Sequence, residues 1–379
     1  MLDRLSIERI RHEMPATTSR TYLNTGTFGP LPNVVLEAVM EHLSSEYHNG
    51  RLGLTAFETM STIYQNARQS VARLFNAEEQ EIALTDNTGE GLNIICHGIN
   101  WQQGDEVITT NHEHISALAP LYQMRDRYGV VLRIADLGPT GDQPAAEAIR
   151  DQITARTRLI VVSHVLWTTG TVLDVNAIGT LGREHGIPVL IDGAQSAGVV
   201  PLDMKTLNVD FYAIPMQKWL CGPDGTGALY VRREALHAIH STYVGYFSMK
   251  HEEGIEWELL EHAQRFELGG RQTSALAGQA AGLNWLEKEV GYQNIFERIS
   301  SLHSYAYKAL QTLPGLTMLT PKAGGSGLLS FTLEGHDVTE VVQQLQEQHN
   351  IYIRNIPNMK SLRVSTGFYN TEEEIDTLM

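Results

Sequence analysis

The stretches PVLIDGAQ (residues 188–195) and FYAIPMQK (residues 211–218) decide the fold of this chain. Each begins with a short apolar run that favours a β-strand, and each run ends in polar side chains. The chain between Asp192 and Lys218 is long enough for one crossover and one further strand. Because open parallel sheets bind ligands beyond the carboxyl ends of their strands, we expect Asp192 and Lys218 to open into one crevice.

Outward from this pair, short apolar runs alternate with helical stretches along the middle of the chain. Strands are expected at residues 81–85, 106–110, 130–135, 159–165, 188–191, 211–214 and 225–232. Strands separated by helices of this length indicate βαβ units. The sequence therefore predicts an α/β fold with a large, mainly parallel, seven-stranded sheet that helices cover on both faces.

Three segments are expected along the chain. Residues 1–32 form an N-terminal segment that packs on a small domain, and residues 33–270 form the large domain. Residues 271–379 supply a bridging helix and a small C-terminal α/β domain. Helical spacing predicts that the bridging helix covers roughly residues 275–313.

Composition excludes several classes of function. The 379 residues carry a formal net charge of -16, and an acidic surface repels phosphate backbones, so no nucleic-acid partner is expected. There are only two cysteines and no apolar run long enough for a membrane span or a secretory leader. We therefore expect a cytoplasmic protein without disulfides and without a membrane partner.

Lys218 and Asp192 together have a chemical meaning. Lys218 is the one lysine in a mainly apolar stretch, and burial makes an amine more nucleophilic because it disfavours the ammonium form. Such an amine can form a Schiff base with an aldehyde cofactor, and a buried carboxylate keeps the pyridine nitrogen of pyridoxal phosphate (PLP) protonated. The competing interpretation is that Lys218 extends to solvent from a strand end and that Asp192 caps a helix.

A phosphate site is predicted at residues 85–91 (TDNTGEG), which follow a predicted strand and precede a helix. Backbone N–H groups at a helix start, with the Thr88 hydroxyl, form an anion site, although ordinary helix caps have the same pattern. The run His112-Glu113-His114 is also compatible with a metal pair, but a stacking role for His114 explains it better, and we expect no metal.

The sequence resembles the class V branch of the fold-type I PLP enzymes, which includes cysteine desulfurases and C–S lyases. The resemblance runs from Tyr22 to the C-terminus. Its most specific pieces are DGAQS at 192–196, the segment 218–227, RFE at 265–267, and RVS at 363–365 followed by YNTEEE at 369–374. It implies a large sheet domain, a small C-terminal domain, PLP as cofactor and a homodimer with the site at the subunit interface.

The resemblance also implies roles for individual residues. On the cofactor side, it assigns the phosphate to Thr88, Gly89 and Gln217, ring stacking to His114, the pyridine nitrogen to Asp192, the phenolate oxygen to Gln195, the Schiff base to Lys218, and the partner subunit's phosphate to Arg271. On the substrate side, it assigns the carboxylate to Arg363. Arg354 is either a second carboxylate ligand or a surface arginine, and Asn24 and Gly26 either close over the substrate or form a plain turn.

Three departures from the desulfurases bear on the substrate. Trp167 and Pro215 stand where many desulfurases have asparagine and serine, so Trp167 is expected to shape the substrate side. Desulfurases also carry a sulfur-accepting cysteine upstream of the carboxylate-binding arginine, and residues 354–363 (RNIPNMKSLR) contain none.

The expected function is therefore β-elimination on cystine or cysteine, catalysed by Lys218 and Asp192 with His114. The products would be pyruvate, ammonia and a persulfide or sulfide, with an iron–sulfur assembly protein as candidate acceptor. The alternatives are a desulfurase-like activity, an aminotransferase or epimerase of the same fold, and a catalytically silent binding protein.

Overall fold

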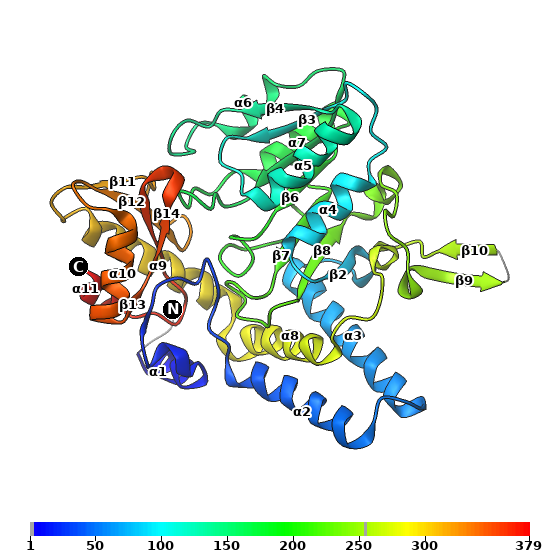
Figure 1. Cartoon of the computed structure of the whole chain (residues 1–379), viewed down its shortest axis with the longest axis horizontal. Helices are drawn as coiled ribbons and strands as arrows, with labels where there is room; N and C mark the ends of the chain where they lie inside the picture. Colours follow the sequence, from blue (N-terminus) through cyan, green and yellow to red (C-terminus); the bar gives the residue numbers. More distant parts are fainter. Residues whose placement is uncertain (1–3, 254–255) are drawn as a thin grey trace.

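The computed structural model describes residues 4–253 and 256–379. Its centre is the seven-stranded sheet expected from the sequence, in the order β2-β8-β7-β6-β5-β3-β4 (Figure 1). The strands are β2 (Ile82–Thr85), β3 (Glu106–Thr110), β4 (Val131–Ala135), β5 (Thr157–Ser163), β6 (Val189–Asp192), β7 (Phe211–Pro215) and β8 (Gly227–Val231). Only β8 runs against its neighbours, so the sheet is mainly parallel.

Apolar side chains on both faces of the sheet explain why helices cover both faces. Along β5, Leu159 and Val161 pack into one core cluster with α4 (Thr88–Gly98) and α5 (Ile115–Tyr128). Ile160 and Val162 point to the opposite face, as the two-residue period of a strand requires. There they join the cluster formed with α6 (Ala145–Arg150) and α7 (Val175–His185).

Three long helices flank the sheet domain at one end: α2 (Asn33–Asn49), α3 (Leu54–Phe75) and α8 (Thr273–Trp285) (Figure 1). The expected bridging helix is not continuous. A π-helical turn at Leu286–Val290 ends at Gly291, whose φ of 84° is open to glycine at little cost, and α9 (Tyr292–Leu310) then begins. The break lets the chain leave the large domain and enter the small one.

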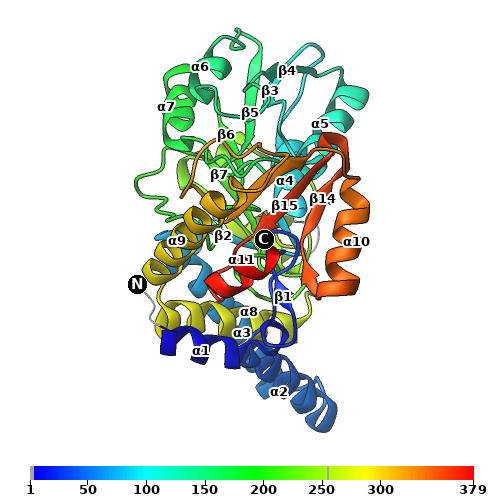
Figure 2. The same cartoon turned by 90° about the vertical axis from the view of Figure 1, so that its left-hand side faces the viewer.

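The small domain is a four-stranded sheet in the order β11-β12-β15-β14, next to α9, α10 (Val338–His349) and α11 (Glu372–Leu378) (Figure 2). Its strands are β11 (Leu316–Met318), β12 (Leu328–Leu333), β14 (Arg354–Ile356) and β15 (Ser361–Ser365). The N-terminal segment contacts this domain. β1 (Thr21–Tyr22) pairs with β13 (Ile351–Tyr352), and Arg11 of α1 (Arg4–Glu13) pairs with Glu374 at 2.9 Å.

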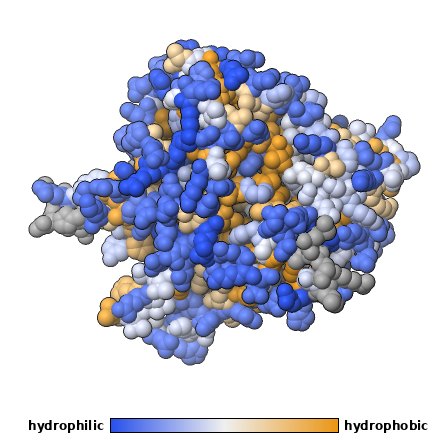
Figure 3. Space-filling model, turned by 180° about the vertical axis from the view of Figure 1, so that it is seen from behind, coloured by the Kyte–Doolittle hydropathy of each residue, from blue (hydrophilic) through white to orange (hydrophobic). Residues whose placement is uncertain are grey.

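Two parts of the large domain project from the molecule (Figures 1 and 3). One is the antiparallel hairpin of β9 (Met249–Glu253) and β10 (Glu256–Leu259). The other is the far end of α2 and α3, where hydrophobic atoms lie on the surface at the lower left of Figure 3. No helix in the described part of the chain is long and apolar enough to cross a membrane.

Candidate active site

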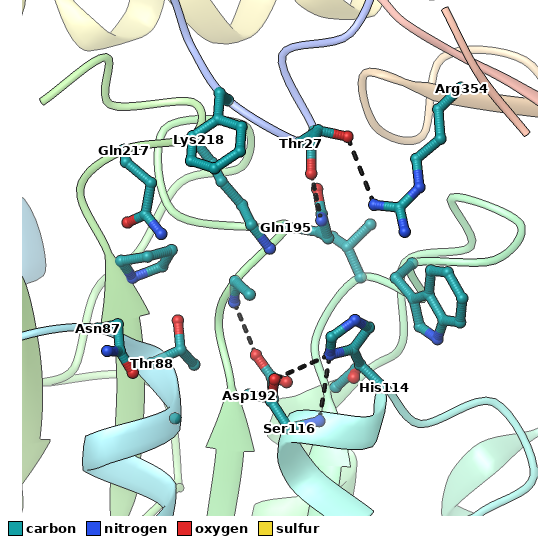
Figure 4. A pocket seen from close by; sticks show the side chains of 18 of the residues that line it. Thr27, Asn87, Thr88, His114, Ser116, Asp192, Gln195, Gln217, Lys218 and Arg354 are labelled. Carbon is teal, nitrogen blue, oxygen red and sulfur yellow. Dashed lines mark hydrogen bonds between the residues drawn. The ribbon is translucent and has the colours of Figure 1, made fainter. Parts of the chain in front are cut away.

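The carboxyl ends of the central strands, the start of α4 and the small domain enclose one cavity of about 340 Å³ (Figure 4). Asp192 is the last residue of β6, and Lys218 follows the end of β7 by three residues. Both open into the cavity, as the parallel arrangement predicts. The N-terminal loop at Gly26 and the arginines of β14 and β15 form the opposite wall.

The charges of Lys218 and Asp192 are set by burial. Desolvation lowers the pKa of Lys218 to about 8; Asp192 opposes this shift, and the positive charges of Arg363 and Arg354 reinforce it. Desolvation raises the pKa of Asp192, which is 3% exposed, and the 2.9 Å hydrogen bond from the Ala194 N–H limits the rise. The cavity therefore holds an amine that is readily neutral and a buried carboxylate.

His114 is held as a neutral ring at the start of α5. Its Nδ1 accepts from the backbone N–H of Ser116 at 3.2 Å, so the free ring edge is Nε2. Desolvation and the charge of Lys218 lower its pKa to about 4. The ring meets the indole of Trp167 edge-on, with centroids 5.1 Å apart. A neutral, fixed aromatic ring on the cavity wall suits stacking.

Two polar atoms on the phosphate side have no partner within the described chain. The Thr88 hydroxyl at the start of α4 and the Gln217 carbonyl oxygen are both buried and unbonded. Both residues line the cavity, so a ligand bound there can supply the missing contacts. The free N–H groups at the start of α4 lie beside Thr88, and this set fits a phosphate group.

The cofactor ring has a matching set of contacts. The Asp192 carboxylate and the Lys218 amine face the cavity together with His114 (Figure 4). Gln195 donates through Nε2 to the Gly26 carbonyl at 2.9 Å and accepts from the Trp219 indole at 2.9 Å, which fixes its amide. The residues present therefore fit PLP.

Two arginines face the cavity without a carboxylate partner in the described part of the chain. Arg363 is fully buried, and desolvation and the nearby charge of Arg354 lower its pKa to about 9. Both guanidinium groups reach the Thr27 hydroxyl at 3.4 Å, and Arg363 also donates to the Trp167 carbonyl at 2.9 Å. Unpaired buried charge is costly, so these arginines indicate an anionic ligand.

Most of the residues predicted from sequence line this cavity: Gly26, Thr88, Gly89, His114, Trp167, Asp192, Gln195, Gln217, Lys218, Arg354 and Arg363. Asn24 does not line it; its side chain instead accepts from the Thr27 hydroxyl at 2.8 Å. Arg271 also lies outside the lining and pairs with Asp86 and Glu90. The His112 ring bonds to Thr168 and to the Gly138 carbonyl, so it is not aimed at His114.

Sequence reasoning missed Thr27 and Ser163. Thr27 is the hydroxyl on which both arginines converge, and only its position next to Gly26 in the loop hinted at it. Ser163 ends β5 and donates to Glu113 at 2.5 Å. Glu113 is 6% exposed, and desolvation raises its pKa to about 7. No sequence pattern pointed to this buried hydroxyl–carboxyl pair beside His114.

Comparisons with known proteins give matches along nearly the whole chain. The Aminotransferase class-V family model matches residues 21–378. A probable cysteine desulfurase of Methanothermobacter thermautotrophicus is 29% identical over 390 residues, covering 98% of this chain and 96% of that protein.

Two solved structures are similar over nearly the whole chain. The complex of the cystine C–S lyase C-DES with its reaction product cysteine persulfide matches with a TM-score of 0.92 and 33% identity, covering 96% of this chain and 97% of that one. A C-DES mutant with glycine covalently linked to its PLP cofactor matches with a TM-score of 0.93 and 33% identity, covering 97% of each chain. The expected fold-type I architecture is confirmed. With the family model spanning residues 21–378, the chain belongs to the class-V aminotransferase family.

Proposed function

We propose that this chain is a PLP-dependent carbon–sulfur lyase that cleaves cystine by β-elimination. The observation that carries the proposal is one cavity that contains Lys218, Asp192 and two unpaired arginines but no cysteine. Class membership and the similarity to C-DES support the same chemistry. When bound, PLP supplies an electron sink that stabilises negative charge at the substrate α-carbon.

The position of each cavity residue gives it a separate role in the proposed reaction. Thr88, Gly89 and Gln217 would hold the phosphate, Asp192 would hold the proton at the ring nitrogen, and His114 would cover one ring face. The Lys218 Nζ, whose pKa is lowered to about 8, is the base that takes the α-proton of the substrate. Loss of that proton and of the Cβ–S bond converts cystine and water into pyruvate, ammonia and cysteine persulfide.

The cysteines of the chain favour a lyase over a desulfurase. Cys96 and Cys221 are both fully buried, and burial raises the pKa of the Cys96 thiol to about 12 and that of Cys221 higher still. A thiol that stays protonated is a poor nucleophile for sulfur. The turn between β14 and β15, which stands beside Arg363, contains no cysteine. Sulfur therefore leaves on the product rather than on the enzyme.

The two arginines favour cystine over cysteine, because cystine carries two carboxylates and cysteine one. Arg363 is the fully buried one and suits the carboxylate next to the reacting carbon. Arg354 is partly exposed, lies with its guanidinium 5.8 Å from the centre of the Trp167 ring, and suits the distal carboxylate. Thr27 would orient both.

The test is product analysis on the purified, PLP-loaded protein. Cystine should give pyruvate and persulfide in equal amounts, without a keto-acid co-substrate. Release of alanine instead of pyruvate would indicate a desulfurase, and a need for a keto acid would indicate an aminotransferase. Absence of any turnover on a panel of sulfur amino acids contradicts the proposal.

We also propose that the chain acts as a homodimer in the cytoplasm and that the persulfide serves an acceptor such as an iron–sulfur assembly protein. Large apolar side chains at the α2–α3 end, including Leu52 and Leu54 at 87% and 76% exposure, support a partner surface there. Transfer of labelled sulfur from cystine to an apo iron–sulfur scaffold protein tests the acceptor.

A further inference from the structure

Two carboxylates flank the turn that would hold the cofactor phosphate. Asp86 directly precedes Asn87, the cap of α4, and Glu90 is the third residue of that helix. Both line the hollow that also contains Asn87 and Gly89. The Glu90 carboxylate accepts from the Asp86 backbone N–H, so the turn depends on it locally. Left unpaired, the two negative charges repel a phosphate dianion bound at the same turn.

Arg271 pairs with both carboxylates. Its guanidinium contacts Asp86 and lies 2.8 Å from Glu90, and its side chain is 8% exposed. Within residues 4–253 and 256–379 no other cation lies within ion-pair distance of either group. Pairing with Glu90 and Asp86 outweighs the cost of burial, so the pKa of Arg271 is raised.

The backbone holds Arg271 in this place. Gly269 and Gly270 have φ of 99° and 71°, a conformation that other residues rarely adopt, and they turn the chain just before Arg271. The Arg271 N–H donates to the Tyr64 hydroxyl of α3 at 3.1 Å, and that hydroxyl donates back to the Arg271 carbonyl at 3.4 Å. Hydrogen bonds to its backbone and ion pairs to its guanidinium group therefore fix Arg271 beside the turn.

We propose that Arg271 is a positioning residue that pairs with Asp86 and Glu90 and offsets part of their negative charge, so that the start of α4 accepts a dianionic phosphate from within the same chain. The inference rests on the proposed function, in which the cofactor is PLP. It differs from a direct contact of Arg271 with the partner subunit's phosphate, because here Arg271 acts through two carboxylates.

The test compares PLP with pyridoxal, which lacks the phosphate, on the full-length protein stripped of cofactor. Binding is followed by absorbance. Arg271→Met should raise the Kd for PLP by about tenfold or more while leaving the Kd for pyridoxal within about twofold. Arg73→Met is the control, because Arg73 forms a comparable pair with Glu287 at 2.9 Å on the surface and should change neither Kd.

Removing the two carboxylate charges together with Arg271 distinguishes an effect through Asp86 and Glu90 from a direct contact of Arg271 with a phosphate. In the triple variant Arg271→Met, Asp86→Asn, Glu90→Gln the negative charges are gone, and PLP affinity should return to within a few-fold of wild type. A triple variant that stays as weak as Arg271→Met overturns the inference, because the lost PLP affinity then does not come from the unpaired carboxylates. Equal losses for PLP and pyridoxal mean a structural role and also overturn it. If the wild type itself binds no PLP, the proposed function fails instead.

Discussion

The charge state of Lys218 is the residue-level property on which the chemistry depends. Its pKa falls from the ordinary lysine value of 10.5 to about 8, first through desolvation and then through the arginines. Between these two values the unfolded chain binds more protons than the folded chain. The stability of the cofactor-free protein should therefore rise as pH increases from 8 towards 10.5, and the cost of burying the amine is fully present below pH 8.

Lys218→Met removes this titration and leaves all other groups in place. Urea unfolding of both cofactor-free chains at pH 8 and pH 10 should show the wild type gaining about 2 kcal/mol relative to the variant. If the difference between the two chains is the same at both pH values, the Lys218 amine has an ordinary pKa.

Arg354 makes a prediction about substrate choice. Arg354→Gln should raise the KM for cystine by about 10- to 100-fold, because a charge-assisted hydrogen bond to the distal carboxylate is lost. The same variant should leave the KM for β-chloroalanine unchanged, since that substrate has one carboxylate and also releases pyruvate on β-elimination. Arg363→Gln should impair both substrates. Equal effects of Arg354→Gln on the two would mean that both arginines bind one carboxylate.

At the scale of single residues, the sequence predicts the site residues that the order of the strands positions. It does not predict those that only side-chain packing positions. Asp192, Lys218 and Thr88 follow predicted strands, so parallel topology alone brings them to one edge. Arg271 could not be placed that way, because its partner Glu90 is remote in sequence. Asn24 could not be placed either, because its side chain contacts Thr27 and not the cavity. Glu113, three residues after β3, accepts a hydrogen bond from Ser163 at the end of β5, and no spacing rule describes this contact.

At the scale of elements, the seven strands of the large sheet were predictable, because buried parallel strands are continuous apolar runs between helices. The apolar spacing over residues 275–313 predicts one bridging helix, whereas the structure has two, α8 and α9. The apolar spacing continues across Gly291, and only the turn of the backbone there separates α8 from α9. Periodicity reports which side of a helix is buried and is insensitive to a change of axis.

The loop after β1 makes a prediction at this scale. The Gly29 N–H donates to the Gln217 carbonyl at 2.7 Å, and a Cβ at Gly29 would lie 2.0 Å from the Lys218 carbonyl oxygen. Gly29→Ala must push the loop away from Lys218, so it should lower the free energy of unfolding by about 1–3 kcal/mol and weaken PLP binding.

Gly325→Ala is the matched control for that loop. A Cβ there meets only a methyl group of Val172 at 3.7 Å, an ordinary contact, so unfolding and PLP affinity should not change. Urea unfolding and PLP titration measure both variants. Equal unfolding free energies and equal PLP affinities for the Gly29 and Gly325 variants would show that the loop does not press on the Lys218 segment.

At the scale of the whole molecule, the uneven surface decides how the chain associates. The described chain buries four apolar clusters, yet α2, α3 and the turn between them expose Met40, Tyr47, Leu52, Leu54 and Phe57 at 55% or more. Apolar side chains gathered at one projecting end mark an interaction site more often than scattered ones do. A second copy of the chain is the partner that we propose for this end.

Leu52→Asp combined with Phe57→Glu places two charges on that surface without touching the cavity. If two copies meet there, the variant should elute as a chain of 42.2 kDa, while the wild type shows twice that mass by light scattering. Tyr128→Asp, at an exposed aromatic residue at the end of α5, is the control and should remain a dimer. The comparison is informative because a burial penalty of several kcal/mol applies only where the charge loses water on association. A dimer that survives both charges would place the contact on another face of the molecule.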